Sequence, residues 1–127
     1  MKSSITLAQV PEAKAGPFVF HQALPDSFAT AASLGFDAVE LFLPGPQFVD
    51  LETVKSMTTK HGLAIAAVGT GAGMVQHGLA LTDADESKRA QALEFVLSMI
   101  EKAIRLIPGR YKALVVYNEG SNFSVGA

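Results

Sequence analysis

The sequence contains no cysteine, and none of its apolar runs approaches the roughly 20 residues that a membrane-spanning helix needs. The absence of cysteine excludes disulfide bonds and thiolate metal sites, and it is compatible with a cytoplasmic protein. Only a short apolar stretch follows Met1-Lys2. We therefore expect a soluble protein with neither a signal peptide nor a membrane anchor.

Charge of either sign is also scarce. Twelve acidic and ten basic residues give a formal net charge of -2, and the basic residues are scattered along the chain. Nucleic acids and anionic membranes bind to clustered basic residues, and this sequence has no such cluster. We therefore expect neither partner. The chain has 127 residues, of which 49% are hydrophobic, and this length is typical of one globular domain. We predict a single domain over residues 1–127.

Short apolar runs alternate with helical patterns along the whole sequence. Strands are expected over 5–9, around 39–43, over 63–68 and over 113–117, and helices over about 26–34, 51–61 and 83–106. This order predicts an α/β fold of parallel βα repeats. It permits either an open doubly wound sheet or part of a (β/α)8 barrel. The strand over 63–68 has no polar member, which is typical of strands covered on both faces.

Several residues predict where the helices begin and end. Gly35 and Gly62 follow helical runs and can close them in the left-handed conformation. Asp50 is the expected N-cap of the second helix, and Pro25-Asp26-Ser27 is the expected cap of the first. The helix over 83–106 should turn its apolar repeat toward the core, namely Ala90, Leu93, Leu97, Ile100, Ile104 and Ile107.

Glu40 is a carboxylate inside an otherwise apolar strand. Such a group either faces solvent or pairs with a Lys or Arg, or it points into a polar site. Ligands of parallel sheets bind at the carboxyl ends of the strands. Glu40 is therefore a candidate site residue.

A glycine-rich loop, Gly69-Thr-Gly-Ala-Gly73, follows the third strand. Such loops can hold phosphate through backbone N–H groups, but this one lacks the Lys-Ser/Thr ending of a P-loop. We interpret Gly69 and Gly71 as letting a substrate approach the backbone, with His77 either above the strand ends or on the surface. His21, in the loop over 10–24, is either an acid/base or ligand group or a packing residue.

Three segments together resemble a known family. Gly16-Pro-Phe-Val-Phe20, Ala32-Ser-Leu-Gly-Phe-Asp-Ala-Val-Glu-Leu-Phe42 and His61-Gly-Leu-Ala-Ile-Ala-Ala-Val-Gly-Thr-Gly-Ala-Gly73 are similar to the start of a sugar phosphate isomerase/epimerase of the xylose-isomerase-like TIM-barrel superfamily. The resemblance covers about residues 5–106 and implies the N-terminal half of a (β/α)8 barrel. After about residue 106 the sequence departs from the family, so the tail is divergent or truncated.

The resemblance also implies a chemistry. Members of that family use a divalent metal (Mn, Mg, Co or Zn) while a carboxylate moves the proton next to a sugar carbonyl. It implies a sugar or sugar phosphate bordered by Glu40, Gly69, Gly71 and His77, whereas His21 stands where the family has a bulky aromatic residue. Glu119, just past the last predicted strand, is placed like a metal-binding Glu of the family.

Most of the family's metal-binding strands are missing from this chain. We therefore expect the chain alone to be inactive and to self-associate, because an open half-barrel exposes strand edges and a sheet face. Two other functions are compatible with the sequence. One is a non-enzymatic module that binds a small molecule or another protein, and the other is a flavodoxin-like domain that binds phosphate at Gly69 to Gly73.

Overall fold

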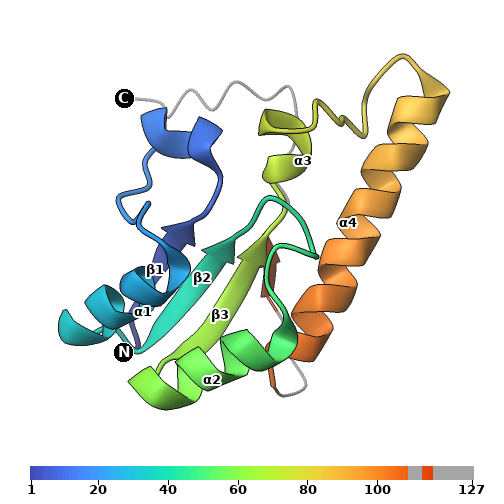
Figure 1. Ribbon diagram of the computed structural model, residues 1–127. Helices are drawn as coiled ribbons and strands as arrows, with labels where there is room; N and C mark the ends of the chain where they lie inside the picture. Colours follow the sequence, from blue (N-terminus) through green and yellow to red (C-terminus); the bar gives the residue numbers. More distant parts are fainter. Residues whose placement is uncertain (109–112, 116–127) are drawn as a thin grey trace.

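The computed structural model describes residues 1–108 and 113–115 (Figure 1). Strands and helices alternate along the chain, which confirms the predicted α/β fold of parallel βα repeats. In order, the elements are β1 (Ser4–Ala8), the 3-10 helix η1 (Pro11–Ala15), α1 (Leu24–Ser33), β2 (Ala38–Phe42), α2 (Leu51–His61), β3 (Ala64–Gly69), α3 (Ala72–Val75), α4 (Glu86–Leu106) and β4 (Ala113–Val115).

The four strands form one parallel sheet in the order β1-β2-β3-β4. Each new strand therefore adds to the same edge of the sheet. A flavodoxin-like sheet instead has the order 2-1-3-4-5, in which the direction of winding reverses. The described sheet contains no such reversal.

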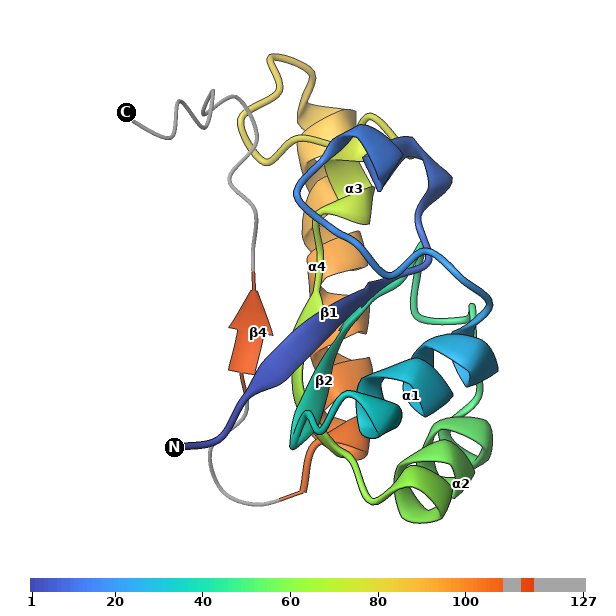
Figure 2. The same cartoon turned by 90° about the vertical axis from the view of Figure 1, so that its left-hand side faces the viewer.

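The three longest helices pack on one face of the sheet. Figure 2 shows α1, α2 and α4 on the same side of β1, β2 and β3. Alternate strand residues point toward them and form one buried apolar cluster with the inner sides of the helices. Its fully buried members are Leu7, Val39, Leu41, Leu43 and Val68 from the strands and the segment after β2, and Phe28, Ala31, Val54 and Met99 from the helices.

The opposite face of the sheet carries the other strand residues, and none of the three long helices packs on it. Apart from Phe42, these residues are smaller or more polar than those of the helix-covered face. They are Ser4, Thr6 and Ala8 on β1, Ala38, Glu40 and Phe42 on β2, and Ala64, Ala67 and Gly69 on β3. On this second face of β3, Ala67 and Gly69 are buried, as expected for a strand covered on both faces, whereas Ala64 at the start of the strand is exposed.

The helix ends follow the sequence at most positions. Asp50 caps α2 by accepting a hydrogen bond of 2.7 Å from the Thr53 N–H, and Gly62 closes the helix at φ 66°. Gly35 likewise has a φ of 81°. The predicted cap of α1 is wrong, because the helix begins at Leu24 with Ala23 as N-cap. Proline is tolerated in a first turn, where no N–H is needed, so Pro25 lies inside the helix.

The predicted core face of α4 is also wrong. Leu93, Leu97 and Ile104 are 52%, 55% and 55% exposed, and of the expected stripe only Ile107 is buried. The helix has a second apolar stripe, and this one contacts the sheet through Ala92, Met99, Ala103 and Leu106. Its two alanines let the helix approach the strands closely. Among the described helices, none is long and apolar enough to cross a membrane.

Candidate functional site

Glu40 is the polar centre of the helix-free face. It is the third residue of β2, opposite Thr6 of β1 and Ala67 of β3 in the register of the sheet. The side chain is half-buried, and burial raises the pKa of its carboxyl group. Within residues 1–108 and 113–115 the carboxylate has no hydrogen-bond or ion-pair partner. It is thus a desolvated acceptor that a hydroxyl or N–H donor would stabilise.

The neighbouring strand is shaped around this carboxylate. Val39 pairs with Ile65 and Glu40 with Ala67, so Ala66 is an extra residue that makes a bulge beside Glu40. At Gly69 an added Cβ would lie 3.1 Å from Cδ2 of Phe42 and 3.8 Å from Oε1 of Glu40. Gly69 therefore adjoins Glu40, as the sequence interpretation requires. The structure explains this glycine by the close approach of the Phe42 ring.

Aromatic side chains border Glu40 toward the carboxyl end of the sheet. Phe42 lies two residues further along the same face, and its ring centroid is 5.1 Å from that of Phe18. Both belong to a second apolar cluster with Ala8, Val10, Ala13 and Ala72. This cluster supplies the apolar surroundings that desolvate a nearby carboxylate. The sequence interpretation did not include Phe18 or Phe42 in the site. Two features of the sequence could have indicated them: Phe42 follows Glu40 by two residues on the same strand, and Phe18 is a large apolar residue in the long loop over 10–24.

His21 is held within its own loop. Its Nε2 is 2.8 Å from the Phe18 carbonyl oxygen, which can only accept, so Nε2 carries the hydrogen. The other nitrogen, Nδ1, is buried without a partner among the described residues. The loop is itself tied to the edge of β1, where the Ala8 N–H donates to the Phe20 carbonyl oxygen at 2.9 Å. His21 is therefore fixed near the carboxyl end of β1, and among the described residues no hydrogen bond joins it to Glu40.

His77 lies on the helix side of the molecule. Its Nε2 is 2.8 Å from the Pro44 carbonyl oxygen, and its exposed ring lies 5.5 Å from that of Phe95 on α4. It lines an open cavity of about 450 Å³ with residues of α4. Glu40 points to the opposite face of the sheet, so the structure does not bring His77 and Glu40 together. Gly71, the third residue of the proposed loop, is the N-cap of α3.

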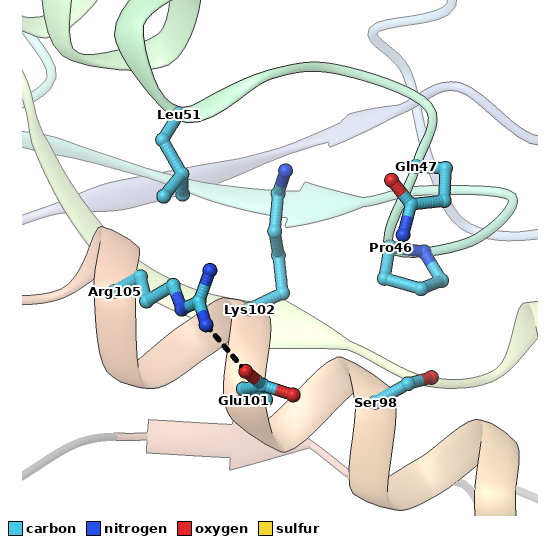
Figure 3. A pocket seen from close by; sticks show the side chains of 7 residues that line it. All are labelled: Pro46, Gln47, Leu51, Ser98, Glu101, Lys102 and Arg105. Atoms are coloured by element: carbon cyan, nitrogen blue, oxygen red, sulfur yellow. Dashed lines mark hydrogen bonds and ion pairs between the residues drawn. The ribbon is translucent and has the colours of Figure 1, made fainter.

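A smaller cavity of about 160 Å³ lies between α4 and the segment that leads into α2 (Figure 3). The Lys102 side chain extends across it and donates from Nζ to the Val49 carbonyl oxygen. Burial lowers the pKa of Lys102, and Asp50 partly opposes this effect. Arg105 at its edge is paired with Glu101 at 2.5 Å. The sequence interpretation did not include this cavity, because it depends on how α4 packs beside the segment that leads into α2.

The described residues do not make a metal site by themselves. Nowhere in residues 1–108 and 113–115 do three His, Cys, Asp or Glu side chains gather closely enough to hold an ion. Glu40 could offer a single carboxylate ligand. Glu119, the predicted metal ligand, lies outside the described residues.

No protein-family model matches the sequence, and no curated protein matches it. The resemblance to xylose-isomerase-like proteins therefore depends on the three sequence segments quoted above. The function is inferred below from those segments and from the arrangement of the sheet.

Proposed function

We propose that this chain is the N-terminal part of a (β/α)8 barrel of the xylose-isomerase-like type, and that the complete barrel acts on a sugar or sugar phosphate as an isomerase or epimerase. The observation that carries the proposal is the pairing of two features. The strands follow one another in sequence order with all long helices on one face, and an unpartnered Glu40 lies on the other face. In a barrel the helix-free face becomes the interior.

Glu40 is proposed to bind the substrate. A half-buried carboxylate without a partner among the described residues is stabilised by a hydroxyl donor, and a sugar supplies such donors in a row of adjacent groups. Thr6 in the same layer offers a hydroxyl that can both donate and accept. Phe42 and Phe18 offer an apolar surface for the C–H side of a sugar ring.

The chain alone is proposed to be inactive. Proton transfer next to a carbonyl needs a base within hydrogen-bond reach of that carbon and groups that stabilise the developing charge on oxygen. The described residues supply Glu40, and the strands of the remaining barrel would supply the rest. An open sheet face exposes apolar side chains to water, and an edge strand such as β4 exposes backbone N–H and C=O groups that can pair with another chain. We therefore also propose that the chain self-associates. Sedimentation that shows a compact monomer at micromolar concentration would contradict this part of the proposal.

A non-enzymatic module that binds a small polar molecule is the second candidate. The observation that favours it is that Glu40 can accept a hydroxyl without any metal. The flavodoxin-like alternative has less support, because the strand order does not reverse and no phosphate-binding role is needed to explain Gly69. Cytoplasmic location remains part of the proposal, as the absence of cysteine favours it.

Calorimetric titration of the chain with a panel of ketoses and ketose phosphates tests the proposal. We expect weak binding to at least one sugar, no turnover, and weak binding of Mn²⁺. Glu40→Gln should weaken sugar binding by about tenfold, since a hydrogen bond to a charged group contributes about 1.5–3 kcal/mol. Glu94→Gln, an exposed glutamate on α4, is the matched control and should bind like the wild type.

Two results would separate the candidates or overturn both. Tight stoichiometric Mn²⁺ binding together with sugar turnover would show that the chain alone holds a complete site. Sugar binding that is strong and independent of any metal would favour the binding module. Identical sugar affinities for the wild type and Glu40→Gln would remove Glu40 from the site in either case.

A further inference from the structure

Lys102 is the polar centre of the cavity between α4 and the segment that leads into α2. Figure 3 shows its side chain between Leu51 and Gln47. Its Nζ donates to the Val49 carbonyl oxygen, which holds the amino group in one place beside the cavity. The side chain is only partly exposed. A fixed and partly buried amino group at an open cavity is an arrangement that suits a nucleophilic lysine.

The hydrogen bond to a carbonyl group suits a neutral amine as well as an ammonium group. The Val49 oxygen can only accept, so it binds one N–H of Lys102 in either protonation state. A neutral amine then keeps its lone pair, which is what attacks an electrophile. An ion pair with a carboxylate would instead favour the ammonium form. In residues 1–108 and 113–115, Lys102 forms no ion pair.

The charged groups around Lys102 act in opposite directions. Asp50, the N-cap of α2, favours the ammonium form, whereas Arg105 on α4 disfavours it. Glu101 also lines the cavity, but its carboxylate is paired with the Arg105 guanidinium at 2.5 Å. Burial has the largest effect, and it lowers the pKa of Lys102. Burial and a neighbouring cation are two means by which proteins activate a lysine as a nucleophile.

The rest of the cavity suits a small carbonyl compound. Pro46 and Leu51 supply apolar walls, and Gln47 supplies an amide that can donate a hydrogen bond to a carbonyl oxygen. The cavity has a volume of about 160 Å³. A cavity of roughly this size can hold a molecule as large as benzene, so a short aldehyde or ketone fits beside Lys102.

We propose that Lys102 is a nucleophilic lysine, and that this cavity binds a small aldehyde or ketone as an imine on the Lys102 Nζ. The neutral amine adds its lone pair to the carbonyl carbon, and a proton passes from nitrogen to oxygen to give a carbinolamine. Loss of the hydroxyl group and the remaining amine proton as water leaves a C=N bond in place of the C=O bond. The site lies on the helix side of the sheet, so the proposal is independent of Glu40.

Reductive trapping followed by site-resolved mass spectrometry tests this inference. The chain is incubated with glycolaldehyde and cyanoborohydride, which reduces an imine to a stable secondary amine, and modification is followed at each lysine. At neutral pH, Lys102 should be modified at least about threefold faster than Lys60. Lys60 is the internal reference, because it is an exposed lysine on α2 with no ion pair in the described ranges. Exposure alone predicts the opposite order.

Two charge substitutions should change the Lys102 rate in opposite directions. Asp50→Asn keeps an N-cap side chain and removes the negative charge that favours the ammonium form, so Lys102 should react at least about twofold faster. Arg105→Gln removes the neighbouring cation and leaves Glu101 without its partner, so Lys102 should react at least about twofold more slowly. The Lys60 rate should stay the same in both variants, and circular dichroism establishes that both keep their helices.

The dependence on aldehyde concentration shows whether the cavity binds the compound. The trapping rate at Lys102 should saturate, whereas the rate at Lys60 should rise linearly. The inference would be overturned if Lys102 reacts no faster than Lys60, if its rate does not saturate, or if neither charge substitution changes it.

Discussion

The two faces of the sheet differ sharply although they belong to the same strands. On β2, Val39 and Leu41 face the helices and are fully buried, whereas Glu40 between them is half-buried and faces the helix-free side. The helix-covered face is filled by large apolar side chains that match one another in shape. The other face combines small residues, the Phe42 ring and the Glu40 carboxylate, which has no partner among the described residues. Residues that are adjacent in the sequence thus have different roles: Val39 and Leu41 pack in the core, while Glu40 is left available for a ligand.

This difference predicts unequal effects of substitution on stability, and the largest is expected on the helix-covered face. Leu41→Ala should lower the free energy of unfolding by about 2–5 kcal/mol, because it leaves a cavity among residues that cannot close it. Thr6→Ala, on the helix-free face of the adjacent strand, should cost less than about 1 kcal/mol. Urea denaturation of both variants measures the contrast. Equal losses would mean that the second face is packed as tightly as the first.

The helix-free face is tightly packed only at its carboxyl end, where Phe42 covers Gly69. Gly69→Ala should destabilise the fold by about 1–3 kcal/mol, because the new Cβ would lie 3.1 Å from the Phe42 ring. Gly45→Ala is the control, since its nearest neighbour, Phe95, is 3.8 Å away. Thermal unfolding compares the two. If Gly69→Ala is as stable as Gly45→Ala, the ring moves freely and the aromatic border is looser than described.

The smallest expected effect on stability concerns Glu40 and depends on pH. Burial raises the pKa of this carboxyl from its ordinary value of 4.5, so the folded state holds the proton more tightly than the unfolded state. Its contribution to stability is present below pH 4.5 and is lost as the pH rises through the raised pKa. Glu40→Gln should therefore stabilise the protein slightly at neutral pH, by less than about 1 kcal/mol because solvent screens a half-exposed group.

Denaturation of the wild type and Glu40→Gln at pH 4 and pH 7 measures this effect. The gain from the substitution should be larger at pH 7 than at pH 4. A larger gain at pH 4 would contradict the direction of the shift.

The sequence predicted the βα order and several helix ends, because these depend on local residues. Asp50 and Gly62 act within one turn of the chain, and their roles follow from their own chemistry. The core face of α4 was not predictable in the same way. That helix has two apolar stripes of similar strength, and only its contact with the strands selects Ala92 and Met99 over Leu93 and Leu97.

The candidate site was predicted in part for the same reason. Glu40 stands out locally as a charge in an apolar strand, and Gly69 adjoins it through the register of neighbouring strands. His77 was grouped with them because it follows the same loop. The chain turns through α3 before reaching it, however, and the ring then lies against Phe95 on the other side of the sheet. The face on which a side chain lies after such a turn depends on tertiary packing.

The central claim is that the helix-free face holds Glu40 desolvated and ready for a hydroxyl donor. Carbon-13 NMR of the glutamate carboxyl groups, titrated over pH with and without a ketose that binds, tests it most directly. We predict that the Glu40 resonance titrates above the ordinary pKa of a glutamate carboxyl group and that the sugar shifts the Glu40 signal and lowers its pKa, since a hydrogen bond to the carboxylate favours the charged form. A Glu40 resonance that titrates with the ordinary pKa of a glutamate carboxyl group and does not respond to any sugar would contradict the account.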